Sequence, residues 1–418
     1  MQKKILMLPG DGIGPELMRE GKKTLQAIGR KYGHKFEFDS APFGAEAHFK
    51  VGSCYPEETR KRVDSGEADG ILKGPVGLNP AGAAKLRADG VKLENETIIA
   101  IRGDLDTYCC YRPVTLTRGL AFFSPLRPEI VGDGIDILML RELVGGIYFG
   151  PKTEGVTKEG KILDVSSDDC TYTRVQIERF AHACFREAQH RGVKLTNVHK
   201  GNIKATGRHW QAIFADVAGQ YPTVTLEECL VDAFATYLNT KPTTYNGVVA
   251  LENMEGDIET DHAGGVIGSL GLMPSACTNP ETGKGYYEPS HGSAPDIAGK
   301  NIANPYSMIG SVAFMLDKCF GMVEEAKDVW NALQNVFAQG NMTRELLRKL
   351  SDAQKSARAD TAFVDLAFAF RKANPDLGTE EIRELIRESY DRRDADLEAR
   401  VVSTSQFGDL VVADIMRS

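Results

Sequence analysis

The sequence lacks several features that would assign it to a broad functional class. Lys and Arg number 50 against 58 Asp and Glu, giving a net charge of −8, so there is no excess of positive charge for binding a nucleic-acid backbone. No apolar run approaches the length of a membrane span, and the apolar residues 5–8 are too few for a secretion signal. We therefore expect no nucleic-acid partner, no membrane partner and a cytoplasmic location.

Cysteine is present, but without a pattern that indicates disulfides or a metal site. The chain has 8 cysteines and no C-x-x-C motif or paired spacing, which favours reduced thiols in a cytoplasm-like compartment. His199 and His291 also have no partners at ligand spacing, so the sequence does not predict a zinc site. No chemistry is assigned to the cysteines.

What the sequence does have is length and an alternating pattern. Its 418 residues, 42% of them hydrophobic, exceed one ordinary domain, so we expect two domains or one core with a long excursion. Short apolar segments such as "KKILMLPG" and "YNGVVALEN" alternate with helical stretches, which predicts an α/β protein. Residues 279–305 lack periodicity and are expected to form a functional loop, whereas the pattern of residues 306–400 is almost wholly helical.

The first apolar segment ends in "LPGDGIGPE", residues 8–16, which invites comparison with a dinucleotide-binding turn. Such a turn has glycines spaced G-x-G-x-x-G, whereas Gly10, Gly12 and Gly14 are spaced G-x-G-x-G and Pro15 stands at the third fingerprint position. Pro15 suits the first turn of a helix. The spacing therefore favours a plain strand-to-helix turn over a Rossmann pyrophosphate site.

Two carboxylates in "LENMEGDIETDHAGG" have a spacing that suits a metal site. Asp257 and Asp261 are four residues apart, so on a helix both lie on one face, where oxygen ligands for Mg²⁺ or Mn²⁺ would need to be. The alternative is the solvated acidic start of a helix, because acidic side chains favour the first helical turn. The spacing alone leaves both interpretations open.

Three arginines lie at the ends of apolar stretches: Arg102, Arg112 and Arg141. Guanidinium groups bind carboxylates through two parallel hydrogen bonds, so three that converge would suit a substrate with two or three carboxylates. Taken singly, each is typical of a surface or salt-bridged arginine. Tyr148 and Lys200 are equally ordinary by themselves, as a core tyrosine and a loop charge.

Taken together, these segments form an ordered series. The motifs "LPGDGIGPE", "RELVGGIYFG", "VHKGNI", "VDA", "NMEGDIETD" and "EPSHGSAPDIAGKNIANP", with an R-x9-RPV pattern, occur along one chain. In this order they resemble the isocitrate/isopropylmalate dehydrogenase family of metal-dependent oxidative decarboxylases. The resemblance extends from about residue 3 to about residue 320 and returns weakly near "STSQFGDLVVADI".

The resemblance implies an isopropylmalate-dehydrogenase-like two-domain fold that is not a Rossmann fold. Residues 1–108 and 265–418 would form a large NAD-binding domain, and residues 109–264 a small domain for dimerisation and metal binding, with the active site in the cleft. A homodimer with shared active sites, or a higher oligomer, is expected. About 60 residues near 333–393 exceed the family core, and we favour a helical insertion that adds oligomer contacts over a regulatory or specificity element.

The resemblance also assigns roles to the residues singled out above. The arginines match positions that hold the carboxylates of the malate core, and the aspartates match ligands of Mg²⁺ or Mn²⁺. Two of the matched residues would come from a second subunit. By this assignment, Arg102, Arg112 and Arg141 bind substrate, Asp257 and Asp261 bind metal together with Asp232 of the second subunit, and Tyr148 and the second subunit's Lys200 form the catalytic pair.

The segment "EPSHGSAPDIAGKNIANP" matches the adenosine seat of the family. In members that prefer NADP the positions of Asp296 and Ile297 tend to be Lys and Tyr, which hold a 2′-phosphate. A carboxylate at position 296 would instead accept a hydrogen bond from a free ribose hydroxyl and repel a phosphate, so NAD is expected. The other matched cofactor residues are Ile13, Glu288, His291, Gly292, Ser293, Ala294 and Asn304.

The substrate is predicted from the helix before Arg102, which in the family faces the substituent on C3. Isocitrate enzymes have Ser and Asn where this chain has Glu96 and Ile98. Glu96 would repel a third carboxylate, whereas Ile98 and Ile99 offer apolar surface. One buried isopropyl group gains roughly 2 kcal/mol in such a pocket, and 3-isopropylmalate is therefore the first choice.

Two departures from the family pattern keep other substrates open. Asn95 replaces a glutamate that is typical of isopropylmalate enzymes, and "VHKGNI" is closer to the isocitrate form. D-malate, tartrate, homoisocitrate and isocitrate are the alternative substrates. A catalytically silent regulatory subunit is the alternative from another class, although all matched catalytic positions are retained.

Overall fold

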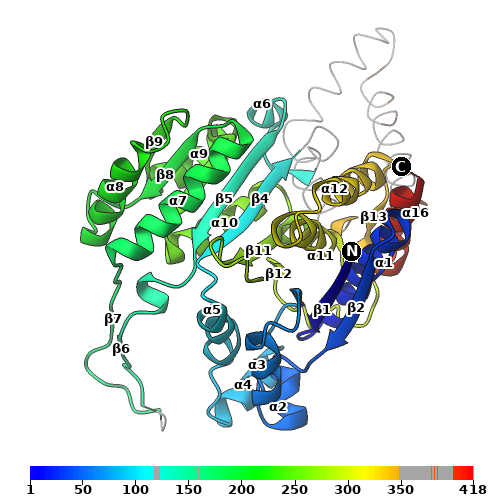
Figure 1. Ribbon diagram of the computed structural model, residues 1–418, viewed down its shortest axis with the longest axis horizontal. Helices are drawn as coiled ribbons and strands as arrows, with labels where there is room; N and C mark the ends of the chain where they lie inside the picture. The colour runs from blue at the N-terminus through cyan, green and yellow to red at the C-terminus, as the bar shows by residue number, and fades with distance from the viewer. Residues whose placement is uncertain are drawn as a thin grey trace.

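The computed structural model describes residues 1–116, 123–157, 160–347, 378, 381, 384 and 399–417. These residues form a mixed α/β structure, which confirms the predicted class (Figure 1). Ten of the described strands make one sheet, in the order β2-β1-β3-β12-β11-β4-β5-β10-β8-β9. The strands are β1 (Gln2–Leu8), β2 (Lys35–Ser40), β3 (Gly70–Lys73), β4 (Cys109–Leu116), β5 (Ile135–Glu142), β8 (Leu195–His199), β9 (Leu226–Leu230), β10 (Gly247–Leu251), β11 (Pro274–Thr278) and β12 (Gly285–Pro289).

The sheet consists of two parallel blocks joined by antiparallel strands. β2, β1, β3 and β12 run parallel to one another, as do β5, β10, β8 and β9. Between the blocks, β11 is antiparallel to both β12 and β4, and β4 is antiparallel to β5. This arrangement differs from the all-parallel sheet of a dinucleotide-binding domain.

The two ends of the chain meet in one half of the sheet, and its middle builds the other half. Strands from residues 2–73 and 274–289 lie on one side of the β11–β4 junction, and strands from residues 109–251 on the other. The predicted domain limits at residues 108 and 265 coincide with this junction, but the sheet and the main apolar core continue through it. The division into two domains stays a prediction.

Helices cover both halves of the sheet (Figure 1). α7 and α8 lie against the middle strands, whereas α1, α11, α12 and α16 pack together near the two chain ends. The first half of the chain contributes α2 (Ala45–Val51), α3 (Glu57–Asp64), α4 (Pro80–Ala88), a wide π-helical turn η1 (Asn95–Ile99) and α5 (Ala100–Leu105), and α10 (Asn253–Val266) follows later. The others are α1 (Gly14–Tyr32), α6 (Pro128–Val131), α7 (Arg174–Arg191), α8 (Ala205–Ala218), α9 (Val231–Thr240), α11 (Tyr306–Phe314), α12 (Val323–Ala338) and α16 (Thr404–Arg417).

Two expectations about the second half of the chain were wrong in part. The supposed loop 279–305 contains the buried strand β12, whose two faces are both covered, so its sequence shows no polar alternation. The supposed helical region 306–400 contains the short strand β13 (Met342–Thr343), which pairs with β14 (Val401–Val402) just beyond the region. Of the predicted insertion at 333–393, residues 333–347 continue α12 and β13, and nearly all the rest lies outside the described residues.

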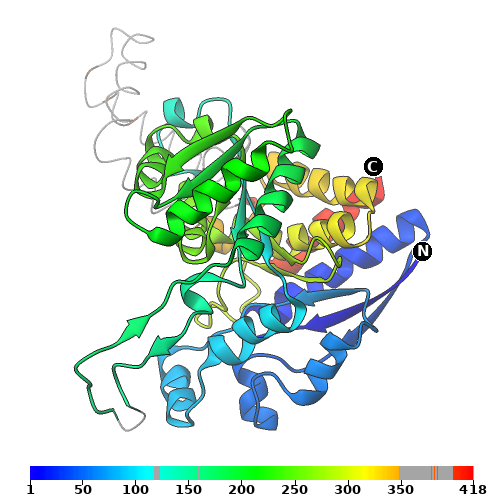
Figure 2. The same ribbon diagram turned by 60° about the vertical axis from the view of Figure 1, so that its left-hand side comes forward.

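A two-stranded arm extends from the middle half of the molecule. β6 (Lys152–Thr153) and β7 (Ser167–Asp168) pair antiparallel, and Figure 2 shows this arm projecting away from the body. Its apolar side chains Val156, Ile162 and Val165 are exposed. Of the helices in the described part of the chain, none has the length and apolarity needed to cross a membrane.

Candidate active site

Two adjoining cavities lie where the halves of the sheet meet. The first has a volume of about 410 Å³ and contains most of the charged residues singled out in the sequence. The second, of about 390 Å³, lies beside the segment after β12. His291 and Gly292 line both, so the two cavities are neighbours across this segment.

The three arginines converge on the first cavity. Arg112 comes from β4, Arg141 from β5 and Arg102 from α5. Arg102 and Arg112 are each 6% exposed and Arg141 is 1% exposed, which excludes the interpretation of these residues as ordinary surface arginines. Three buried guanidinium groups need anionic partners, because an unpaired buried charge is costly.

The two aspartates face these arginines from one side of α10, as their spacing predicted. Arg141 is paired with the Asp257 carboxylate, and the Arg112 Nη1 atom lies 3.5 Å from Asp261 Oδ1. Arg141 also donates to the Asn253 carbonyl oxygen (2.8 Å) and Oδ1 (2.9 Å), which fixes its plane at the start of α10. The helix begins there because the Glu252 carboxylate accepts the Glu255 N–H (3.1 Å) as an N-cap.

The electrostatics of the cavity favour bound anions. Burial opposes ionisation of Asp257, but the charges of Arg141, Arg112 and Arg102 outweigh it and lower the pKa of Asp257 below its usual 3.8. Burial raises the pKa of Asp261. Burial and the neighbouring Arg102 charge lower the pKa of Arg141. Three guanidinium groups facing two carboxylates carry a net positive charge, which an anionic ligand would neutralise.

Tyr148 lies in the same cavity, in the short helical turn η3 (Gly146–Tyr148) after β5. Its hydroxyl donates a hydrogen bond to Asp257 Oδ2 (3.1 Å). Burial and the Asp257 charge raise the pKa of Tyr148, so the phenol keeps its proton at neutral pH. The hydroxyl is a proton donor placed beside the carboxylates.

A second buried ion pair, which no sequence pattern indicated, lies in the cavity wall. Lys73, at the end of β3, pairs with Glu288 of β12, and both line the first cavity. Glu288 was assigned to the cofactor seat, but its carboxylate is on the substrate side. The partners are 215 residues apart in the chain, so only the pairing of β12 with β3 brings them together.

η1 and the residue before it form part of the lining of the first cavity. Ile98 and Ile99 line the cavity, as expected, but the acidic residue there is Glu94 and the polar one Asn95. The expectation for Glu96 was wrong: it is absent from the lining, and its carboxylate accepts the Lys92 N–H (3.3 Å). In a π-helical turn each hydrogen bond joins residues five positions apart instead of four. The side chains therefore point in other directions than regular α-helical spacing predicts.

Lys200 and Asp232 lie away from both cavities of this chain. Lys200 follows β8 and Asp232 lies in the first turn of α9, and the Lys200 Nζ atom is 2.7 Å from Asp232 Oδ1. The Lys200 hydrogen bond lowers the pKa of Asp232. The structure therefore brings these two residues to each other but not to Asp257.

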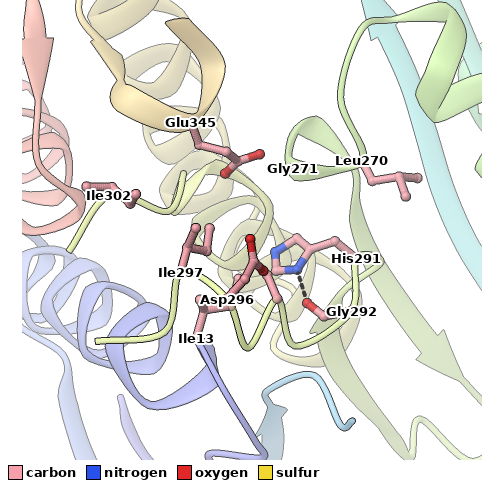
Figure 3. A pocket seen from close by; sticks show the side chains of 10 residues that line it. Ile13, Leu270, Gly271, His291, Gly292, Asp296, Ile297, Ile302 and Glu345 are labelled. Atoms are coloured by element: carbon pink, nitrogen blue, oxygen red, sulfur yellow. Dashed lines mark hydrogen bonds between the residues drawn. The ribbon is translucent and has the colours of Figure 1, made fainter. Parts of the chain in front are cut away.

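Part of the predicted cofactor segment surrounds the second cavity. Figure 3 shows Asp296 and Ile297 near His291, with Glu345 approaching from the opposite side. His291 Nδ1 lies 2.8 Å from the Gly292 carbonyl oxygen, which holds the ring at the border between the two cavities. Sequence reasoning missed Leu270, Gly271 and Glu345, which belong to no predicted motif, and it gave no role to Ile302, which lies within the predicted segment. The residues around this cavity are Ile13, Leu270, Gly271, His291, Gly292, Ala294, Asp296, Ile297, Ile302 and Glu345.

Ser293 and Asn304 are buried beside the second cavity without lining it. The Ser293 carbonyl oxygen accepts the Ile13 N–H (2.9 Å), and a Cβ atom at Gly12 would lie 2.1 Å from that oxygen. Gly12 also has a φ of +58°, so glycine is required for both reasons. The opening glycines thus hold the first turn against the segment 290–294, which agrees with the interpretation as a strand-to-helix turn.

The comparisons with known proteins agree with this architecture. A sequence model of the isocitrate/isopropylmalate dehydrogenase family matches residues 4–362. The 3-isopropylmalate dehydrogenase of Listeria innocua is 41% identical over 350 residues, 83% of this chain and 94% of that protein. The enzyme of the same name from Shouchella clausii is 41% identical over 378 residues, 90% of this chain and 100% of that protein.

The solved structures show the same fold. The isocitrate dehydrogenase of Methylococcus capsulatus superposes with a TM-score of 0.74 at 25% identity, covering 99% of both chains. The predicted isopropylmalate-dehydrogenase-like fold is thus confirmed. On the match to residues 4–362 and the identity of about 40% to curated relatives, this chain belongs to the isocitrate/isopropylmalate dehydrogenase family.

Proposed function

We propose that the protein catalyses the NAD- and divalent-metal-dependent oxidative decarboxylation of a 3-substituted malate, with 3-isopropylmalate as substrate. The observation that carries the proposal is the first cavity, where three buried arginines face Asp257, Asp261 and Tyr148, and where Ile98 and Ile99 add apolar surface to the lining. The curated relatives named 3-isopropylmalate dehydrogenase support this choice of substrate.

The donor set in the cavity fits Mg²⁺ or Mn²⁺. Asp257 and Asp261 present carboxylate oxygens, the ligands that hard divalent cations prefer. Among the described residues, no group of three or more His, Cys, Asp or Glu could hold a metal ion within one chain, which suits a site completed by Asp232 of a second subunit. When bound, the cation supplies Lewis-acid stabilisation of the negative charge that develops on the substrate oxygens.

The neighbouring second cavity suits NAD. Ile13, Ile297 and Leu270 offer apolar surface, and Asp296 offers a carboxylate for ribose hydroxyl groups. Because His291 and Gly292 line both cavities, a cofactor in the second cavity would lie close to a substrate in the first. When bound, NAD would supply the acceptor for the hydride of substrate C2.

The chain's own residues bind the substrate and move its protons. Arg102, Arg112 and Arg141 bind and orient the two carboxylates of the malate core. Lys200, delivered from the second subunit, accepts the proton of the C2 hydroxyl group as the hydride departs. After CO₂ leaves C3, Tyr148 donates its phenol proton to that carbon.

The surface around Lys200 supports an active site shared between two subunits. Ile203, Tyr237 and Ile258 are exposed apolar side chains near Lys200, Asp232 and Asp257 in the sequence. The arm adds Val156, Ile162 and Val165. Exposed apolar side chains on several neighbouring elements are typical of a subunit interface. We therefore propose a homodimer that buries these side chains.

The proposed function is tested with a panel of 2-hydroxy acids. NADH formation is followed with NAD, Mn²⁺ and each of 3-isopropylmalate, isocitrate, homoisocitrate, D-malate and tartrate. The proposal expects the highest kcat/KM with 3-isopropylmalate and no turnover after chelation of the metal. Faster turnover of isocitrate would contradict the choice of substrate, and no turnover of any acid would favour the silent regulatory subunit.

Shortening the apolar wall should weaken selection of the isopropyl group. Ile98→Ala removes methyl and methylene groups that line the first cavity, and kcat/KM for 3-isopropylmalate is expected to fall about 10- to 30-fold. D-malate has no C3 substituent, so its kcat/KM should change less than threefold. An equal loss with both substrates would show that Ile98 does not contact the substituent.

Charging the arm should separate the subunits. Ile162→Asp with Val165→Asp places two carboxylates on an exposed apolar surface, and we expect a monomer by sedimentation and loss of turnover, because Lys200 no longer reaches a second site. Glu154→Gln is the control on the same arm, since it only alters an exposed pair with Lys92. A double variant that remains dimeric would argue against an apolar arm contact.

A further inference from the structure

A cluster of paired charges lies between the segment that carries Lys200 and the first turn of α10. The Lys204 Nζ atom is 3.3 Å from Glu252 Oε1 and 3.1 Å from Glu255 Oε1. The two glutamate side chains are 7% and 9% exposed. Without Lys204, the two neighbouring buried carboxylates would lose the lysine with which both are paired and would repel each other.

Lys204 is tightly connected to Lys200. The Lys204 N–H donates to the Lys200 carbonyl oxygen (2.8 Å), which closes a turn of the backbone just before α8. The Ile203 N–H donates to the same oxygen (3.2 Å). Lys204 therefore belongs to the same hydrogen-bonded turn from which Lys200 projects.

The other end of the cluster leads to the substrate cavity. The Tyr172 hydroxyl donates to Glu252 Oε2 (3.0 Å) and accepts the Asn253 N–H (3.0 Å). Asn253 in turn accepts two hydrogen bonds from Arg141. The described contacts thus form a continuous path from the Lys200 turn to an arginine that faces Asp257.

Little space remains in which another group could take the place of the lysine. The cavity bordered by Lys204, Glu252 and Glu255 has a volume of about 10 Å³, which is room for at most one water molecule. The Glu255 Oε2 atom is buried without a hydrogen-bond partner in the described part of the chain. The Lys204 ammonium is therefore the cation on which the cluster depends.

We propose that Lys204 is a positioning residue that fastens the Lys200 turn to the start of α10. It acts through Glu252 and Glu255, and so fixes Lys200 relative to Arg141 and Asp257 of the same chain. The inference rests on the proposed function of Lys200 as the proton acceptor. In a dimer with shared sites, Lys200 of one chain serves the partner's site, whereas Asp257 of that chain serves its own site. The Lys204 contact would therefore set the distance between the two sites' reacting groups.

The test replaces Lys204 in the full-length protein. Lys204→Met keeps the length of the side chain and removes its charge, and Lys204→Arg keeps the charge. Lys194→Met is the matched control, because Lys194 forms an ion pair with Glu227 (2.7 Å) at similar exposure, 28% against 25%, without contacting α10. Hydrogen exchange of residues 200–204 and 252–257 is measured together with kcat and the KM for NAD.

In the Lys204→Met variant, the backbone amide hydrogens of both segments are expected to exchange with solvent at least about tenfold faster than in the wild type. Its kcat should fall about 10- to 100-fold, with the KM for NAD within about twofold, because a misplaced reacting group costs rate rather than cofactor binding. Lys204→Arg should restore most of kcat, and Lys194→Met should match the wild type. Where Lys204→Met does not fold, Glu255→Gln provides the same readouts with both lysines in place.

Unchanged exchange in residues 200–204, unchanged kcat, or an equal effect of Lys194→Met would overturn the positioning role. The exchange measurement needs no turnover, so it separates this inference from the proposed function. A wild-type protein that turns over none of the acids, yet shows the faster exchange in Lys204→Met, would refute the proposed reaction and keep the structural link.

Discussion

Replacing Lys200 by alanine is expected to lower kcat for 3-isopropylmalate by about 10²- to 10⁴-fold, the usual contribution of a positioned acid or base. The C2 hydroxyl proton then has no acceptor as the hydride leaves. NAD binding should be unchanged, because Lys200 lies outside the cavity assigned to the cofactor. The measurements are initial rates of NADH formation and calorimetric titration with NAD.

The same variant tests whether Lys200 serves a second subunit. Lys200→Ala chains are co-expressed with Asp257→Asn chains, each nearly inactive by itself. In a mixed dimer with shared sites, one site then receives an intact Lys200 and an intact Asp257, so random pairing should restore about a quarter of the wild-type kcat. Asp232→Asn is the matched control partner, because Asp232 and Lys200 lie together and would be donated together, so no complete site forms.

Restoration by Asp257→Asn but not by Asp232→Asn would be specific to shared sites. If neither mixture regained activity while mixed dimers were present, the two residues would have to act within one chain. That result would be inconsistent with the distance of Lys200 from the substrate cavity in this structure. Loss of NAD binding in Lys200→Ala would instead point to a role at the cofactor.

The parts of the fold that the sequence predicts are those with a strong period. Leu17, Gly21, Leu25 and Ile28 recur at helical spacing and are all buried in α1. β12 was missed because "GYYEP" is short, carries a glycine and a proline at its ends, and is buried on both faces. Such a strand has no alternation to detect, and only its pairing with β3 and β11 shows what it is.

The site was predictable where one segment carries the geometry. The i, i+4 spacing of Asp257 and Asp261 placed both on one face of α10, where the structure has them. Convergence of the arginines was not visible, because β4, β5 and α5 bring them together from distant segments. Glu94 lines the cavity where Glu96 was expected, and the cause is local, because the side chains of the π-helical turn η1 do not follow regular α-helical spacing.

Charge contacts between distant segments were the least predictable. The Lys73–Glu288 pair and the Lys204–Glu255 pair each join residues far apart in the chain, and neither pair has a spacing that a sequence pattern could reveal. The Lys73–Glu288 pair lines the first cavity, whereas the Lys204–Glu255 pair, with a buried glutamate and a partly exposed lysine, borders a separate small cavity. Sequence motifs therefore located the candidate site residues, whereas the ion pairs around them required the three-dimensional structure.

Exchanging Asp296 and Ile297 for Lys and Tyr is expected to reverse the cofactor preference. Both side chains line the second cavity, and the Asp296 carboxylate is the acidic group on the side formed by the segment after β12 (Figure 3). It would accept a hydrogen bond from a ribose hydroxyl of NAD and repel the 2′-phosphate of NADP. The double change Asp296→Lys with Ile297→Tyr replaces the repulsion of the 2′-phosphate by a charge-assisted hydrogen bond to it.

The ratio of kcat/KM for NADP to that for NAD should rise at least about 100-fold, since each 1.4 kcal/mol of differential binding changes it tenfold. Most of the change should be in KM, because the reacting groups lie in the first cavity and are untouched. The gain should also shrink at high ionic strength, since Asp296 is exposed and its interactions are screened by salt.

Glu345→Gln is the matched control, because Glu345 is a second carboxylate lining the same cavity from the opposite side. Its removal should leave the ratio of the two cofactors within about threefold of the wild-type value, since the charge that faces the 2′ position would still be Asp296. An equal shift in Glu345→Gln would mean that the net charge of the cavity selects the cofactor. If the Asp296 and Ile297 changes left the ratio unchanged, the adenosine end of NAD would not bind at this segment.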